Sequence, residues 1–200
     1  MSFLRFTAIG AMLMAGSLAL AQTAAPVRLR GTIEKADAAS VTVRERSGEV
    51  ITLALPAKYT FQEVYPIDIA AIQPNAFIGT AAVPGRDGAL EALEVVVFPE
   101  AARGTGEGHY PWDLKADTSM TNATVADLVR QAGSRRLTLR YKDGEKTVVV
   151  PDGVPVVTFR PGEAALVRPG ARVFIVAAEV GGQPTVSRLV VGRDGFAPPM

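Results

Sequence analysis

The sequence repeats itself: two stretches of the 200-residue chain carry the same pattern in the same order. The first begins GTIEKADAASVTVRERSGEVITLAL at residue 31, and the second begins ATVADLVRQAGSRRLTLRYKDGEKTVVV at residue 123. Farther along, IQPNA at 72–76 aligns with VRPGA at 167–171, a spacing of 95 residues. A regular spacing of this kind indicates a duplicated structural unit. We therefore expect two copies built from the same elements.

Each copy contains five segments with the composition of β-strands. In the first copy they cover 27–36, 40–46, 49–55, 76–83 and 92–98. Apolar and polar residues alternate along the second of these segments, which is typical of a sheet with one solvated face. The 19 glycines, the 14 prolines and the low aromatic content also favour short strands joined by turns over long helices.

The connections between the predicted strands also recur. Ser47-Gly48 and Asp143-Gly144 mark tight hairpin turns, and we expect positive φ at the central residues of the Asp-Gly turn. The longer connections PIDIAAIQP (66–74) and PGEAALVRP (161–169) combine an early acidic residue with an alanine-rich middle and a closing proline, which predicts a short helix. Segment 125–131 has the composition of a helix, but the repeat favours a strand there.

This order of elements predicts a mainly all-β protein with two tandem five-stranded OB-like β-barrels, each with a short helix between its third and fourth strands. A pair of SH3-like or sandwich-like modules is the alternative. The predicted boundaries are a signal peptide at 1–21, a first barrel at 22–100, a Gly/Pro linker at 101–120, a second barrel at 121–192 and a tail at 193–200.

The N-terminus has the features of an export signal. One basic residue, Arg5, precedes an apolar run that ends in Ala19-Leu20-Ala21, and this pattern of small residues fits cleavage before Gln22. The run is shorter than the roughly 20 residues of a membrane-spanning helix, so an uncleaved anchor is the lesser alternative. We expect a bacterial protein of the periplasm or the exterior, with no membrane span after cleavage.

The charge of the processed chain limits which partners it can bind, and its cysteine content limits how its fold is stabilised. Loss of Arg5 would leave 20 basic and 20 acidic residues, so the net charge would be zero. A neutral chain gives little support for binding nucleic acid or anionic membranes. The sequence contains no cysteine, so the fold depends on core packing without disulfides.

The tandem copies resemble a family of secreted bacterial proteins whose OB-like domain is catalogued as of unknown function. The most specific parts of the resemblance are the linker RGTGEGHYPWDLK (103–115), MTNATV (120–125) and the tail VGRDGFAPPM (191–200). Relatives are sometimes labelled metal ABC transporter permease, but a permease needs several spanning helices. The resemblance implies a fold and a location, and it supplies no catalytic residues.

The linker contains the only histidine and the only tryptophan of the chain. Glu107, His109 and Asp113 have side chains that bind divalent metals, although no second histidine or cysteine completes the set. The alternative is a structural strap in which Trp112 fills the groove between the two copies. In that interpretation Trp112→Ala loosens the contact and speeds proteolysis near Arg103.

Aromatic residues suggest a second type of site. Tyr110 and Trp112, together with Tyr59, Phe61 and Tyr65, have the chemistry of a binding surface for a sugar or peptide. Large aromatic side chains also commonly pack inside a protein, so a core role for YTFQEVY (59–65) is the alternative.

No motif for catalysis stands out, and we expect no enzyme and no resident cofactor. The leading hypothesis is an exported, non-enzymatic binding module for an envelope protein, a polymer or a small molecule. The alternatives are a periplasmic metal-binding protein that uses the linker histidine, and a structural envelope protein.

Overall fold

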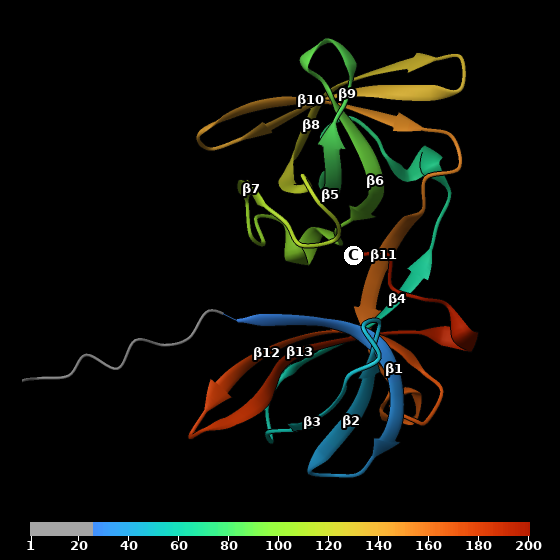
Figure 1. The fold of residues 1–200 in the computed structure, drawn as a ribbon. Coiled ribbons are helices and arrows are strands. Elements are labelled where there is room, and N and C mark those ends of the chain that lie inside the picture. Colours follow the sequence, from blue (N-terminus) through green and yellow to red (C-terminus); the bar gives the residue numbers. More distant parts are fainter. Residues whose placement is uncertain (1–25) are drawn as a thin grey trace, which may run out of the picture.

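The structure, a computed structural model, describes residues 26–200 and shows an all-β protein (Figure 1). Within these residues there are no α-helices, only short 3-10 turns. The thirteen strands are β1 (Val27–Ala36), β2 (Ser40–Glu45), β3 (Val50–Ala54), β4 (Thr60–Pro66), β5 (Phe77–Pro84), β6 (Leu90–Val97), β7 (Gly108–Pro111), β8 (Ser119–Gln131), β9 (Ser134–Tyr141), β10 (Gly144–Pro151), β11 (Val156–Pro161), β12 (Arg172–Val180) and β13 (Gln183–Gly192).

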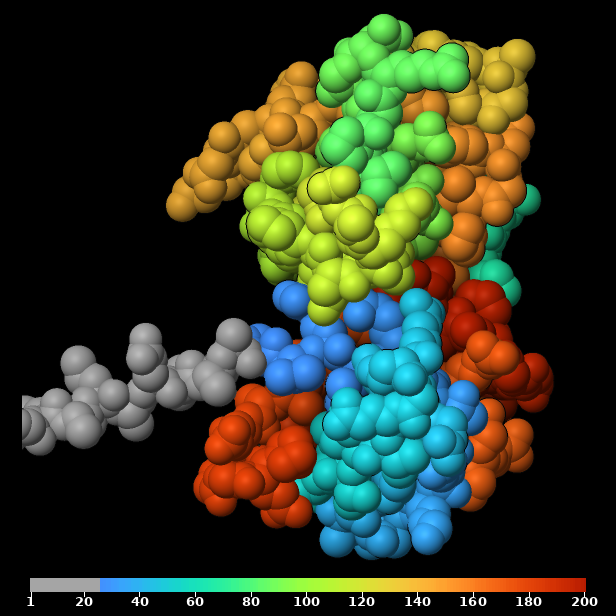
Figure 2. Space-filling view, in the orientation of Figure 1, coloured from blue at the N-terminus to red at the C-terminus, as the bar shows by residue number. Residues whose placement is uncertain are grey.

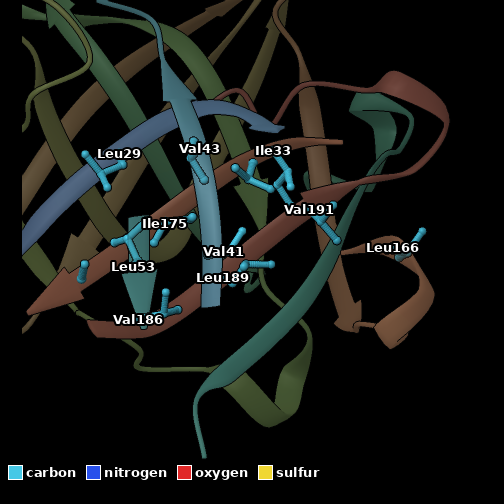
Figure 3. Packing of buried hydrophobic residues seen from close by; sticks show 12 residues of the cluster. Leu29, Ile33, Val41, Val43, Leu53, Leu166, Ile175, Val186, Leu189 and Val191 are labelled. Atoms are coloured by element: carbon cyan, nitrogen blue, oxygen red, sulfur yellow. The ribbon is translucent and has the colours of Figure 1, made fainter. Parts of the chain in front are cut away.

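Five strands close a mixed barrel. β1 pairs with β2 and β2 with β3, all antiparallel, while β1 also pairs with β12 and β12 with β13. A parallel contact between Ala54 of β3 and Thr185 of β13 completes the ring. Alternate residues of these strands point inward, so Val41, Val43 and Leu53 are buried with Ile175 in one apolar core (Figure 3). The other eight strands are bonded on the outside of this barrel.

The upper strands in Figure 1 pair in the same order as the barrel strands. β8 pairs with β9, β9 with β10, β10 with β6 in parallel, β6 with β5, and β5 with β8. We call these five strands the upper lobe, and β1, β2, β3, β12 and β13 the lower lobe. β4 and β11 run between the lobes and pair with each other.

Residues of the two sequence copies occupy corresponding places in the strand pairing. Ile33 pairs with Val43 in the lower lobe, and Val125 pairs with Leu139 in the upper lobe. These equivalent residues are 92 (125 − 33) and 96 (139 − 43) positions apart. On β4 and β11, which we call the crossing strands, Val64 pairs with Phe159, its own counterpart 95 residues later (159 − 64). The pairing is consistent with a duplicated unit, which stays a prediction from the sequence.

The strand pairings do not show the expected pair of tandem barrels. The barrel combines the first three strands of copy one with the last two strands of copy two, so it spans both of the predicted barrel segments, 22–100 and 121–192. The reason lies in β4, which is extended and carries the chain from the lower to the upper lobe before β5 begins. In this exchange, strands of one copy take neighbours from the other copy. The sequence repeat could not reveal it, because each strand has an equivalent neighbour whether that neighbour comes from its own copy or from the other one.

Two local predictions were wrong. The predicted helices at 66–74 and 161–169 are single 3-10 turns, Ile69–Ala71 and Ala164–Leu166, and they follow the crossing strands. The predicted Asp-Gly hairpin exists, but neither Asp143 nor Gly144 has positive φ. Gly144 pairs with Tyr141, so the two loop residues are Lys142 and Asp143. The strand predicted at 125–131 is confirmed as part of β8.

No helix within residues 26–200 is long and apolar enough to cross a bilayer. The predicted signal peptide at 1–21 and its cleavage site lie outside the described residues.

Candidate binding cleft between the lobes

An apolar cluster, here called the interlobe cluster, lies around the crossing strands. Its buried members are Val64, Val96, Val157, Phe159, Phe174, Val190 and Met200, with Phe98, Trp112, Val176 and Phe196 packed against them. These residues come from β4, β6, β11, β12 and β13, the linker and the C-terminal segment. A cleft of about 150 Å³ opens beside the cluster, and the linker contributes part of its wall. Figure 2 shows the yellow-green linker on the side of the upper lobe that faces the lower lobe.

Trp112 enters this cleft because the linker is held as a strand. β7 pairs with β8, and the backbone N–H of Trp112 donates to the Thr118 carbonyl at 2.8 Å. The Arg28 guanidinium lies 4.1 Å from the centre of the indole, and the Phe174 ring centroid is 6.4 Å away. The indole Nε1 is buried and has no hydrogen-bond partner among the described residues. A buried donor of this kind costs about 1–3 kcal/mol unless something accepts from it.

Asn122 provides the complementary group. Its Nδ2 donates to the Thr105 carbonyl at 3.0 Å and lies 3.3 Å from the Tyr110 hydroxyl. Its Oδ1 is buried, and no donor reaches it from the described part of the chain. Gly79 faces this oxygen closely, since a Cβ there would lie 2.5 Å from it. One unpaired donor, Trp112 Nε1, and one unpaired acceptor, Asn122 Oδ1, therefore lie buried in residues that line the cleft.

Arg188 is the one charged side chain that lines the cleft, and the lining also includes Met200, whose terminal carboxylate accepts from Arg30 Nε at 2.8 Å. Its Nε donates to Gln62 Oε1 at 3.0 Å, and its guanidinium lies 5.0 Å from the centre of the Phe159 ring. Burial lowers the pKa of Arg188, while the nearby Tyr110 hydroxyl acts in the opposite direction. No aspartate or glutamate side chain in residues 26–200 lies within ion-pair distance of Arg188.

The three predicted metal ligands are engaged separately. Glu107 Oε1 accepts from the Lys142 backbone N–H at 3.0 Å, and His109 Nδ1 lies 2.9 Å from the Thr121 hydroxyl. Asp113 instead pairs with Arg30 at 2.7 Å and with Arg28 at 3.7 Å. Burial, followed by the charge of Lys146, lowers the pKa of His109. In the described ranges no group of three histidine, cysteine, aspartate or glutamate residues is placed to hold a metal.

The predicted aromatic surface is divided among three places. Tyr110 and Trp112 lie together in the cleft, with their ring centroids 6.2 Å apart. Tyr59 and Phe61 pack against the barrel core, 6.1 Å apart. Tyr65 stacks under Arg160, whose guanidinium carbon is 4.9 Å from the ring centre. Of the predicted set, only the two linker residues, Tyr110 and Trp112, line the cleft.

Sequence reasoning missed the residues that complete the cleft. Asn122, Arg188 and Gly79 come from β8, β13 and β5, which lie far apart in the chain. The one signal available was a charged residue inside an apolar strand: RLVV at 188–191 begins with an arginine. That pattern does not tell which residues the arginine faces.

Two buried carboxylates lie outside the cleft lining and have opposite electrostatic environments. Glu63 on β4 accepts paired hydrogen bonds from Arg160 and Arg193, and these bonds lower its pKa to about 2. Glu94 on β6 accepts only from the Ala81 backbone N–H, at 3.0 Å, and its Oε2 has no partner in the described structure. Burial raises the pKa of Glu94 to about 8.

The unpaired Glu94 gives a testable pH dependence. Between pH 4.5 and 8 the unfolded chain releases a proton that the folded chain retains, so Glu94 lowers the free energy of unfolding as the pH rises. We expect Glu94→Gln to match the parent at pH 4 and to exceed its stability at pH 8 by up to about 5 kcal/mol, from 1.36 kcal/mol for each pKa unit. Urea unfolding at both pH values measures the difference. The exposed Glu91→Gln serves as the control, and an equal response of both variants would contradict the assignment.

Comparisons with known proteins give no match: no family model, no curated protein and no solved structure is detectably similar to this chain. The resemblance to a secreted bacterial family therefore stays a prediction from sequence. The structure supports a mostly-β protein with a five-stranded mixed barrel.

Proposed function

We propose that this protein is an exported, non-enzymatic binding module that holds a small molecule in the cleft between its two lobes. The unpaired Trp112 Nε1 and Asn122 Oδ1 carry the proposal, since both belong to residues that line one cleft. Buried polar groups in native proteins are nearly always hydrogen-bonded, and exceptions call for a missing partner. A ligand with an acceptor and a donor supplies that partner.

The size and lining of the cleft favour a small molecule over a polymer. An engineered apolar cavity of about 150 Å³ binds benzene, so the cleft suits a ligand of about one ring. Its wall combines aromatic and apolar side chains with a few polar groups, which is the usual composition of small-molecule sites. The indole, amide and guanidinium groups bind and orient a ligand, and none of them is a nucleophile or a base near neutral pH.

The architecture is consistent with an OB-like module. The barrel has five strands with one parallel contact, between its third and last strands β3 and β13. The upper lobe repeats this pairing order, and we propose that it forms a second barrel of the same kind. Export to the periplasm or the exterior rests on the apolar N-terminal run and on the small residues of Ala19-Leu20-Ala21 that end it.

The single tryptophan of the chain makes the cleft directly observable. In a screen of uncharged and charged one-ring compounds against residues 22–200, binders should shift the NMR signal of the Trp112 indole N–H. Trp112→Phe keeps an aromatic ring but lacks the N–H, so calorimetry should show binding weakened about fivefold to tenfold, from a net hydrogen-bond contribution of about 1 kcal/mol. Tyr65→Phe, outside the cleft, should bind like the parent. Binders that leave the indole signal unchanged would contradict the proposal.

A further inference from the structure

The charge of the cleft indicates which class of ligand it holds. Arg28 and Arg30 share the carboxylate of Asp113, and Arg30 also donates to the terminal carboxylate of Met200 at 2.8 Å. Arg188 has no such partner in the described residues, although it is partly buried against Phe159. A guanidinium that has lost part of its hydration without gaining a counter-ion is destabilising, and an anion that reached it would relieve that cost.

The guanidinium is also oriented for an incoming anion. Only its Nε takes part in the hydrogen bonds of residues 26–200, through Gln62, and the Phe159 ring supports its face. The two terminal nitrogens are therefore free to make the paired contacts that guanidinium groups form with carboxylates. Because one edge is already fixed, little side-chain entropy remains to be lost on binding.

We infer, on the basis of the proposed binding cleft, that the ligand is a small monocarboxylate with a flat apolar body. Its carboxylate binds Arg188, its body packs on Trp112 and the interlobe cluster, and a hydroxyl or amide on the body pairs with the Trp112 N–H and Asn122 Oδ1. The terminal carboxylate of Met200 is already bound by Arg30, whereas Arg188, the one charged side chain of the lining, would be balanced by one negative charge on the ligand. A phosphate group carries about two charges near neutral pH and leaves one of them without a partner.

The experiment compares two probes of equal size, 4-hydroxybenzoate and the uncharged 4-hydroxybenzyl alcohol, on residues 22–200. The NMR shift of the Trp112 indole N–H reports occupancy for each probe. We expect the carboxylate to bind at least tenfold more tightly than the alcohol at low salt. Arg188→Gln should remove that advantage and weaken the binding of the alcohol much less than that of the carboxylate, while Arg188→Lys should keep part of the advantage because the charge remains. The exposed Arg172→Gln is the matched control and should behave like the parent.

The outcomes separate the two levels of the proposal. If the alcohol binds as tightly as the carboxylate, or if Arg188→Gln leaves the affinities for both probes unchanged, the carboxylate inference is wrong and the cleft remains a binding site. If neither probe shifts the indole signal, both the inference and the proposed function are contradicted. Unfolding curves of the Arg188 variants show whether each is folded, and Arg188→Lys provides the charge test should Arg188→Gln unfold.

Discussion

Cutting the chain between β6 and β7 should leave neither half able to fold alone, and mixing the halves should restore the native protein. Residues 26–104 contain β1, β2 and β3 but lack β12 and β13, which close the barrel. Seven of the twelve buried residues in the barrel core come from beyond the cut: Leu166, Val173, Ile175, Ala177, Val186, Leu189 and Val191. Each buried side chain of this size contributes about 1.5–3 kcal/mol, whereas a whole domain is stable by only about 5–15 kcal/mol.

A protease site placed between Gly104 and Thr105 makes the experiment clean. This bond lies in an exposed connection, so we expect the nicked protein to stay associated and to elute at the size of the intact one. After separation in denaturant, each fragment should lack a cooperative unfolding transition as a monomer, and an equimolar mixture should regain it. A stable, cooperatively unfolding monomer of residues 26–104 would show that copy one closes its own barrel.

Replacing Glu63 should cause the largest stability loss of any single charged residue. Its side chain is 1% exposed and joins Arg160 of β11 to Arg193 beyond β13, at 2.8 Å from each. Removing one member of a buried ion pair costs about 3–5 kcal/mol, and the partial exposure of the two arginines moderates that cost. We expect Glu63→Ala to lower the free energy of unfolding by about 2–4 kcal/mol in denaturant titrations. Glu145→Ala, which breaks the exposed pair with Arg140, should cost less than about 1 kcal/mol.

The same carboxylate should govern acid sensitivity. The pKa of Glu63 is near 2 in the folded protein and near 4.5 in the unfolded chain, so its stabilisation is complete above pH 4.5. It is lost as the pH falls from 4.5 toward 2, by about 3 kcal/mol in total. The Glu63→Ala variant should therefore lose less stability than the parent over that interval. An equal loss in both would assign the acid sensitivity to other groups.

The sequence predicted the repeating local elements and missed how they are connected. Segment 125–131 was correctly assigned as a strand because the repeat outweighed its helical composition. Residues 60–66 were not assigned to any strand, and they form the crossing strand that exchanges the halves. An alternating pattern specifies which face of a strand is buried, but it does not specify which copy supplies the neighbouring strand.

The candidate site was predicted in part for the same reason. Trp112 and Tyr110 stood out as aromatic residues in a glycine-rich linker, and both line the cleft. Arg188 and Asn122 reach the cleft only because β13 and β8 are carried to opposite sides of it. Their roles depend on the exchange of strands between the lobes, which no local sequence pattern encodes.

Strand exchange can be measured directly by cross-linking β1 to β12. Thr32 and Arg172 are directly opposite in the register, and the natural sequence has no cysteine to compete. Opposed residues of antiparallel strands lie about 4.5–5.5 Å apart between their Cα atoms, which suits a disulfide. The double variant Thr32→Cys/Arg172→Cys should form an intrachain disulfide, identified as one linked peptide pair by mass spectrometry. Two tandem barrels would instead place Phe77 opposite Thr32. A disulfide in Thr32→Cys/Phe77→Cys, with none in Thr32→Cys/Arg172→Cys, would therefore contradict the exchange of strands between the two copies.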